Sequence, residues 1–133
     1  MKKYKFTGES RFHNGVVLNQ IVAIKDFGYV KVGDVGGWIQ SESNLSHDSG
    51  CWVYENAIVF WDSCVSGDAR VSGNAWVDGD AWVFGNARVS GNSRVSGNAW
   101  VYGNAWVFGD AWVYGNARVS GNSRVSGKEA IND

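Results

Sequence analysis

From Gly67 to Ser126 the chain repeats a six-residue unit, glycine, Asn or Asp, Ala or Ser, a variable residue, valine and a second variable residue, ten times without interruption. A short fixed period of this kind is typical of solenoids, in which each repeat packs mainly on its neighbours. The glycine in every unit would cost ~1 kcal/mol inside a helix and interrupts any 3.6-residue stripe. The repeat therefore predicts an all-β solenoid of short strands and bends.

Each unit separates an inner from an outer set of side chains. Ala75 and Val77 lie two residues apart, so in a strand they share one face, and the same holds in the other units. That face is the expected core, and residues such as Trp76 then point outward. The Gly-Asn or Gly-Asp pair tolerates the backbone angles of a tight corner.

Less regular copies of the unit extend the repeat toward the N-terminus. They occupy Ser49 to Tyr54, Glu55 to Phe60 and Trp61 to Ser66. A weaker match at Ser43 to Asp48 places His47 where valine is expected. A further copy follows at residues 127–132. These limits predict one structural domain, with a β-rich cap over residues 1–42 and the repeat over 43–133.

The cap has its own pattern of strands and turns. Val16 to Ile24 and Tyr29 to Val32 have the composition of strands. Turns are expected at Gly33, Gly36 and Gly37. At the other end, the charges of Lys128, Glu129 and Asp133 are expected to protect the last coil from pairing with another chain.

The run Val77-Asp78-Gly79-Asp80-Ala81-Trp82 and its copies resemble the family of hexapeptide-repeat proteins, which form a single-stranded left-handed parallel β-helix. The resemblance implies three units per triangular coil, so that residues eighteen apart stack on one wall. It also implies a solenoid of about four to five coils.

The N-terminal region is similar to the opening of hexapeptide-repeat proteins encoded by phages and prophages. The resemblance rests on Lys25-Asp26-Phe27-Gly28, on Gly33 to Ile39 and on Asn44-Leu45-Ser46. It implies a phage- or prophage-encoded accessory protein, and one hypothesis is that it inhibits a host defence.

The best-known activity of hexapeptide-repeat enzymes is acyl transfer, which uses a histidine base beside a loop that leaves the coils. Here the only histidines are His13 and His47, and no insertion interrupts the units between Ser49 and Ser126. A general base also needs a pocket. The sequence therefore predicts a protein that is not an enzyme and has no cofactor, with an acyltransferase-like protein as an alternative.

Charge, the length of apolar runs and the N-terminal sequence argue against several other classes of protein. The formal charge of -1 gives no basic excess for nucleic-acid binding, and no apolar run approaches the ~20 residues that cross a membrane. No signal peptide follows Met1, so a soluble protein of the cytoplasm, or of the host cytoplasm, is expected. Cys51 and Cys64 are expected to be free thiols, and the Gly-Asn and Gly-Asp pairs are interpreted as corners, with no metal site.

Large aromatic side chains occupy many of the outward positions. Eighteen-residue stacking places Trp82 and Phe84 beside Trp100 and Tyr102 on one wall, and Arg70 beside Arg88 on another. Exposed Trp, Tyr and Arg are enriched in binding hot spots. The candidate binding residues are Trp82, Phe84, Trp100, Tyr102, Trp106, Phe108, Trp112, Tyr114, Arg70 and Arg88.

These outer residues support several hypotheses about partners. The main hypothesis is a non-catalytic protein that binds a protein partner, a small charged ligand held by Arg70 and Arg88, or further copies of itself in a homo-oligomer. Glycan binding is an alternative, because indole faces stack on sugar rings. A further, less favoured interpretation is that the aromatics only stack on one another along the wall.

Overall fold

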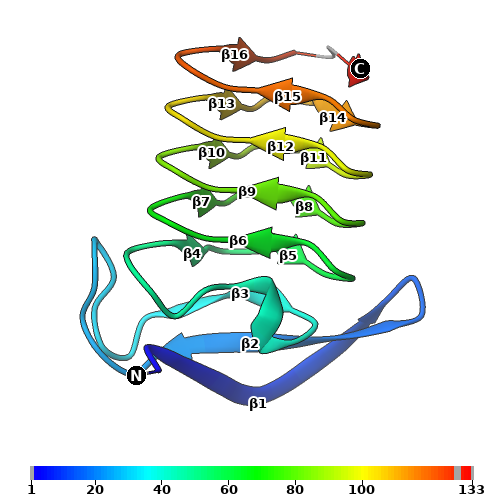
Figure 1. Cartoon of the computed structure of the whole chain (residues 1–133). Coiled ribbons are helices and arrows are strands. Elements are labelled where there is room, and N and C mark those ends of the chain that lie inside the picture. The colour runs from blue at the N-terminus through cyan, green and yellow to red at the C-terminus, as the bar shows by residue number, and fades with distance from the viewer. Residues whose placement is uncertain (1, 128–129, 133) are drawn as a thin grey trace.

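The computed structural model describes residues 2–127 and 130–132, and in these residues the chain forms a parallel β-solenoid of about five coils standing on a β-hairpin cap (Figure 1). No α-helix occurs in the described chain; a 3-10 turn, η1, spans Glu42–Asn44. In Figure 1 the strands at the front point left while the chain climbs, so the coils wind in the left-handed sense that the resemblance implied. The fold class expected from the sequence is confirmed.

The solenoid has three walls, named here in chain order. Wall A contains β1 (Tyr4–His13), β2 (Val16–Ala23), β3 (Val35–Ile39), β5 (Ile58–Val59), β8 (Trp76–Val77), β11 (Arg94–Val95), β14 (Trp112–Tyr114) and β17 (Ala130–Asn132). Wall B contains β6 (Cys64–Val65), β9 (Trp82–Val83), β12 (Trp100–Val101) and β15 (Arg118–Val119). Wall C contains β4 (Trp52–Val53), β7 (Arg70–Val71), β10 (Arg88–Val89), β13 (Trp106–Val107) and β16 (Arg124–Val125).

Neighbouring strands of a wall are eighteen residues apart from β4 to β17, as in the pairing of Trp82 with Trp100 and of Val83 with Val101. Backbone amides of one coil donate to carbonyls of the next; Trp82 N, for example, donates to Ala99 O at 3.0 Å. Strands follow one another at six-residue intervals, so no loop leaves the coils between Cys51 and Ser126.

The interior of the coils is a column of alanine and valine. Ala75, Val77, Ala81 and Val83 have no exposed surface, and the alanines and valines at the equivalent positions of the coils up to Val125 are also buried. Ser63 and Ser93 stand at alanine positions, where their hydroxyls donate to carbonyl oxygens, at 2.8 Å from Phe60 O and 2.7 Å from Ser90 O respectively. The core therefore forms only when coils stack, because no single unit encloses its own valine.

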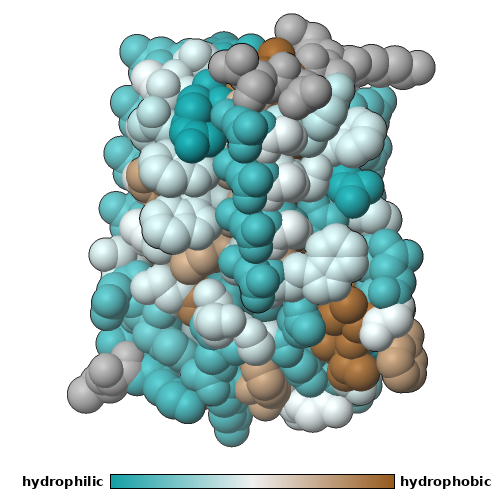
Figure 2. Space-filling view, turned by 45° about the vertical axis from the view of Figure 1, so that its right-hand side comes forward, coloured by the Kyte–Doolittle hydropathy of each residue, from teal (hydrophilic) through white to brown (hydrophobic). Residues whose placement is uncertain are grey.

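The corners explain why glycine opens each unit. Gly79 has a φ of +66°, and a Cβ there would lie 2.9 Å from the backbone nitrogen of Gly97 in the next coil. The residue after each glycine forms a second column; Asn74 Nδ2, for example, donates to Asn92 Oδ1 at 3.2 Å. One such hydrophilic column runs up the middle of Figure 2, at the corner that lies on the right in Figure 1.

The less regular units keep this corner geometry without glycine. Ser49, Glu55 and Trp61 have φ values of +60°, +59° and +57°. A side chain in this left-handed region costs roughly 1 kcal/mol or more. The early coils therefore carry backbone strain that the later, glycine-containing coils avoid.

The cap is built differently from the expected pattern. β1 and β2 form an antiparallel hairpin, and β2 pairs with β3, which pairs in parallel with β5. β1 was not expected, because its side chains are mostly exposed and give no core pattern. The strand expected at Tyr29–Val32 is wrong: that segment lies in a loop with a single bridge between Phe27 and Val30.

Gly36 and Gly37 do not form turns, contrary to expectation, but lie inside β3. A Cβ on Gly36 would stand 2.6 Å from Val53 O, and one on Gly37 would stand 2.6 Å from Ala57 O. Glycine is needed at both positions because the backbone of the first coil packs directly against them. Gly33, with a φ of +91°, is a turn residue as expected.

The first coil is two residues longer than the others. Ile39 pairs with Val59, and Leu45 with Val65, both twenty residues apart. Leu45 therefore occupies the place in which His47 was expected, and the parallel ladder begins at β3, before residue 43. The extra residues belong to the segment between Leu45 and Val53.

Two residues of the cap close the lower end of the coil. Lys3 is fully buried, and its ammonium donates to Cys51 O at 2.8 Å and Ser49 O at 3.0 Å. Burial lowers the pKa of the Lys3 ammonium. The Tyr4 hydroxyl donates to Leu45 O at 2.7 Å. The corresponding prediction for the other end, protection by Lys128, Glu129 and Asp133, lies outside the described residues.

Candidate ligand-binding groove

The structure places the ten candidate residues on three different walls rather than in one site. Trp82, Phe84, Trp100 and Tyr102 lie on wall B, and Trp112 and Tyr114 lie on wall A. Trp106, Phe108, Arg70 and Arg88 lie on wall C. The assignment of residues to walls agrees with the eighteen-residue stacking expected from the sequence.

On wall B the aromatic rings stack on one another along the solenoid axis. The rings of Trp82 and Trp100 are 5.6 Å apart with an interplanar angle of 9°, and those of Phe84 and Tyr102 are 5.0 Å apart at 2°. The Arg118 guanidinium covers the upper indole at 4.2 Å from the centre of the Trp100 ring. Each of these two indoles therefore has at least one face covered by a neighbouring coil.

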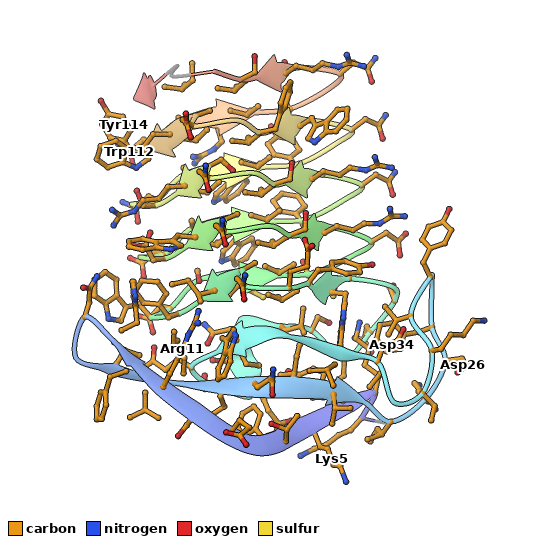
Figure 3. All side chains as sticks on the ribbon, turned by 180° about the vertical axis from the view of Figure 1, so that it is seen from behind. Lys5, Arg11, Asp26, Asp34, Trp112 and Tyr114 are labelled. Carbon is orange, nitrogen blue, oxygen red and sulfur yellow. The ribbon has the colours of Figure 1, made fainter. Side chains whose placement is uncertain are left out.

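Wall A alternates indoles with an arginine. The Arg94 guanidinium lies 5.2 Å from the Trp76 ring centre and 5.4 Å from that of Trp112. It also donates to the buried carboxylate of Asp78 at 2.8 Å. Burial raises the pKa of Asp78, against the opposite effect of Arg94. Trp112 and Tyr114 lie side by side at the edge of the upper coils in Figure 3.

On wall C two arginines occupy paired positions on neighbouring strands. Arg70 on β7 pairs directly with Arg88 on β10, so the two side chains leave strands that are ~4.8 Å apart. Among the described strand pairs of the three walls, this is the one step that stacks like charges. Like charges in directly opposite positions destabilise a sheet.

Within the described chain, neither guanidinium has an oxygen partner. Arg94 pairs with Asp78, and Arg118 donates to backbone carbonyls, for example Asn116 O at 3.1 Å. The guanidinium groups of Arg70 and Arg88 instead lie over aromatic rings, Arg70 at 4.3 Å from the Tyr29 ring centre and Arg88 at 5.6 Å from that of Trp106. None of their ten donor N–H groups makes a hydrogen bond in the described chain.

A loop of the cap extends over these arginines. It carries Tyr29 between Asp26 and Asp34, which are labelled beside the lower coils in Figure 3. The loop is held by two backbone amides, since Val32 N donates to Asp26 and Lys31 N donates to Asp34, each at 2.9 Å. Tyr29 itself is 78% exposed although it rests on Arg70.

The two arginines stand between two open grooves. One groove, of about 380 Å³, is lined by Tyr29, Tyr54, Glu55, Arg70, Ser72, Arg88, Ser90 and Trp106. The other, of about 450 Å³, is lined by Gly28, Tyr29, Gly50, Asp68, Arg70, Asn86 and Arg88. Both volumes fall within the range of roughly 300–1,000 Å³ that is usual for small-molecule sites. We call the first the aromatic groove and the second the polar groove.

Sequence reasoning identified Arg70, Arg88 and Trp106 but missed Tyr29 and Tyr54. Tyr54 stands in the same column as the outward aromatics that were chosen, so the repeat pattern contained a signal for it. Tyr29 is forty-one residues before Arg70 in the chain and lies in a segment that was expected to be a strand. Only the fold of the cap brings it to the wall.

The two histidines lie away from this groove. His47 stacks on Tyr4 with ring centres 4.1 Å apart; Lys3 N donates to its Nδ1 at 3.1 Å, so its Nε2 donates to Glu42 at 2.8 Å. This arrangement occupies both ring nitrogens within the cap. His13 lies at the hairpin tip against Trp76, with ring centres 4.3 Å apart, and burial lowers its pKa.

The structure also shows the state of the two cysteines, the grouping of potential metal ligands and the character of the helices. Cys51 and Cys64 are free, as expected, and burial raises the pKa of both thiols. No group of three or more His, Cys, Asp or Glu side chains gathers in a metal-binding arrangement in this part of the chain. None of its helices has the length and apolar character needed to cross a membrane.

The fold and the walls define the class: a parallel β-solenoid of hexapeptide repeats with outer ladders of arginine and aromatic side chains. The model of the YdcK beta solenoid repeat matches residues 65–79, 81–97, 93–109, 99–115 and 111–127. The chain is also 40% identical over 76 residues to the "Uncharacterized acetyltransferase YdcK" of Escherichia coli (strain K12). That match covers 50% of this chain and 23% of the relative, so the chain spans about a quarter of that protein.

Proposed function

We propose that this solenoid is a non-catalytic binding protein and that the Arg70–Arg88 pair on wall C binds a small anionic ligand. The observation that carries the proposal is a like-charge pair with no oxygen partner in the described chain, at the edge of two grooves. The repulsion between two such cations in water is on the order of 1 kcal/mol. A bound anion would remove that cost and accept charge-assisted hydrogen bonds from both side chains.

The nearby carboxylates do not neutralise the pair. Glu55 Oε1 accepts a hydrogen bond from Gly73 N at 2.8 Å, and Asp68 Oδ1 accepts one from Gly50 N at 3.0 Å. Neither carboxylate approaches a guanidinium within ion-pair distance among the described contacts. The arginines therefore remain available to a ligand, and an oxyanion with two or three oxygens matches two adjacent guanidinium groups.

The test is the binding of inorganic phosphate and sulfate, measured by calorimetry at low salt. Arg70→Gln and Arg88→Gln are each expected to weaken phosphate binding at least tenfold, because a hydrogen bond to a charged group contributes about 1.5–3 kcal/mol. Arg118→Gln on wall B is the matched control, since it removes the same charge away from the grooves. Equal losses in all three variants would mean that only net charge matters and would refute the proposed site.

The wider biological assignment stays a prediction. The sequence suggests a phage- or prophage-encoded accessory protein of the host cytoplasm that binds a host protein or assembles with itself, with glycan binding as an alternative. Stacking of sugar rings requires a free indole face, and Trp100 has the Trp82 ring on one side and the Arg118 guanidinium on the other. This arrangement favours a stabilising role for the wall B ladder over a glycan platform.

Acyl transfer is the second candidate, and the name of the Escherichia coli relative, an uncharacterized acetyltransferase, is the observation in its favour. Its test is direct: incubate the protein with acetyl coenzyme A and follow thiol release with amine and hydroxyl acceptors. His13→Gln is the variant to compare, because the other histidine, His47, has both nitrogens occupied. If the protein releases the coenzyme A thiol and His13→Gln abolishes that release, acyl transfer replaces the non-catalytic proposal.

A further inference from the structure

We infer that the ligand of wall C is a phosphate ester that carries a flat ring, in the class of the mononucleotides. This inference rests on the proposed function and narrows it from an anion to a ring-bearing anion. It follows from the shape of the aromatic groove, the free face of Tyr29 and the position of the arginines between two grooves of different character.

The aromatic groove exists because two successive coils carry serine where the coils above and below carry large rings. In this column the order is Tyr54, Ser72, Ser90 and Phe108. Each step along the wall is ~4.8 Å, so the two serines leave a slot about two coils high between the rings. Such a slot admits a ring system lying along the wall, and its volume of about 380 Å³ suits a small molecule.

The slot offers ring surface on which a ligand can stack. One face of Tyr29 rests on Arg70, and the tyrosine remains 78% exposed. Tyr54 and Trp106 bound the slot, and the indole N–H of Trp106 is directed to Ser90 Oγ at 3.4 Å. An aliphatic anion would leave the exposed face of Tyr29 in water, whereas a flat aromatic ring would cover it.

The two grooves would hold different parts of the proposed ligand. Arg70 and Arg88 line both grooves, so a phosphate held by them has the aromatic groove on one side and the polar groove on the other. The polar groove presents the side chains of Asp68 and Asn86, which hydrogen-bond to hydroxyl groups such as those of a sugar. In the aromatic groove, Glu55 has a second carboxylate oxygen that can accept from a ring amine.

The experiment compares four probes by calorimetry on the full chain: adenosine monophosphate, adenosine, ribose 5-phosphate and inorganic phosphate. Stacking of a base on an aromatic side chain contributes about 1–3 kcal/mol. Adenosine monophosphate is therefore expected to bind about 5- to 150-fold more tightly than ribose 5-phosphate or inorganic phosphate. Adenosine, which lacks the anion, is expected to bind more weakly than the monophosphate by a similar factor.

Two tyrosine variants separate the ring from the phosphate. Tyr29→Ala is expected to weaken adenosine monophosphate binding about tenfold and to change phosphate binding less than twofold, whereas Tyr29→Phe retains both. Phe12→Ala on the cap hairpin is the matched control, because Phe12 is 79% exposed and lines neither groove, and it is expected to leave all affinities unchanged. Urea midpoints of the variants check that each remains folded.

The outcomes distinguish this inference from the proposed function. If inorganic phosphate binds in an Arg70- and Arg88-dependent manner but adenosine monophosphate binds no more tightly, the ring-bearing ligand is excluded and the anion site stands. If no probe binds at millimolar concentration, both are overturned. Equal weakening by Tyr29→Ala and Phe12→Ala would also overturn the inference, because Tyr29 would then not be the stacking surface.

Discussion

The close stacking of glycine corners provides a quantitative test of the solenoid, by comparing Gly79→Ala with Gly121→Ala. Both glycines have nearly the same backbone conformation, with φ values of +66° and +64°. A Cβ on Gly79 would meet the backbone nitrogen and oxygen of Gly97, both at 2.9 Å, whereas one on Gly121 has no neighbour within 4 Å. The two substitutions therefore differ only in the contact with the next coil.

The expected magnitudes follow from three contributions. Placing a side chain in the left-handed region costs roughly 1–2 kcal/mol, and alanine recovers about 0.4–1 kcal/mol by restricting the unfolded chain. Gly121→Ala should therefore reduce the free energy of unfolding by about 1 kcal/mol. Overpacking against Gly97 adds roughly 1–3 kcal/mol for Gly79→Ala, since the neighbour is backbone and cannot move aside without breaking inter-coil hydrogen bonds.

Urea unfolding followed by tryptophan fluorescence measures both losses. The expected result is a reduction for Gly79→Ala that exceeds that for Gly121→Ala by about 1–3 kcal/mol, with the same dependence on urea. Equal losses would show that coils are not in backbone contact at the corners and would refute the reasoning. A terminal coil that unfolds separately would be recognised because Gly121→Ala would then have no effect on the main transition.

Three further predictions concern strain, titration and the buried ion pair. Ser49→Gly should raise the free energy of unfolding by roughly 1 kcal/mol, because Ser49 has a φ of +60°; the urea midpoint measures this. Burial raises the pKa of Tyr4 well above its usual value, so the folded state retains this proton longer than the unfolded state. Stability should thus be lost as pH rises above ~10, and Tyr4→Phe should lose less between pH 9 and 11 in parallel urea titrations. Arg94→Gln should cost about 2 kcal/mol by leaving the Asp78 carboxylate buried without a partner, and Asp78→Asn in the same chain should recover part of this in thermal unfolding.

The repeat region was predictable because its physical constraints are local and recur every six residues. The inward place of Ala75 and Val77 and the corner at Gly79 follow from the period. The neighbour of Trp82 on the next coil follows from the three units per coil that the resemblance to hexapeptide-repeat proteins implies. The cap offered no such repetition. There, Gly36 and Gly37 were assigned to turns although they are needed for close packing, and Leu45 takes the place expected for His47.

The candidate site was predictable in part for the same reason. Eighteen-residue stacking alone places Arg70 beside Arg88. It does not reveal whether an arginine has a partner, because Arg94 finds Asp78 on an adjacent coil while Arg70 and Arg88 find only rings. The availability of two cations for a ligand is a property of contacts between coils.

The six-residue period by itself determined that the chain forms a solenoid with valine and alanine inside, because these residues share one face of each short strand. The resemblance of the same sequence to hexapeptide-repeat proteins added the three walls and the order of side chains along each wall. The tertiary structure decided how the first coil is closed and what lies over wall C. Lys3 and Tyr4 reach the lower coil through hydrogen bonds to carbonyls more than forty residues away. Tyr29 rests on Arg70 because the cap loop folds against that wall. Such contacts depend on the positions of distant backbone segments, and local residue patterns do not specify them.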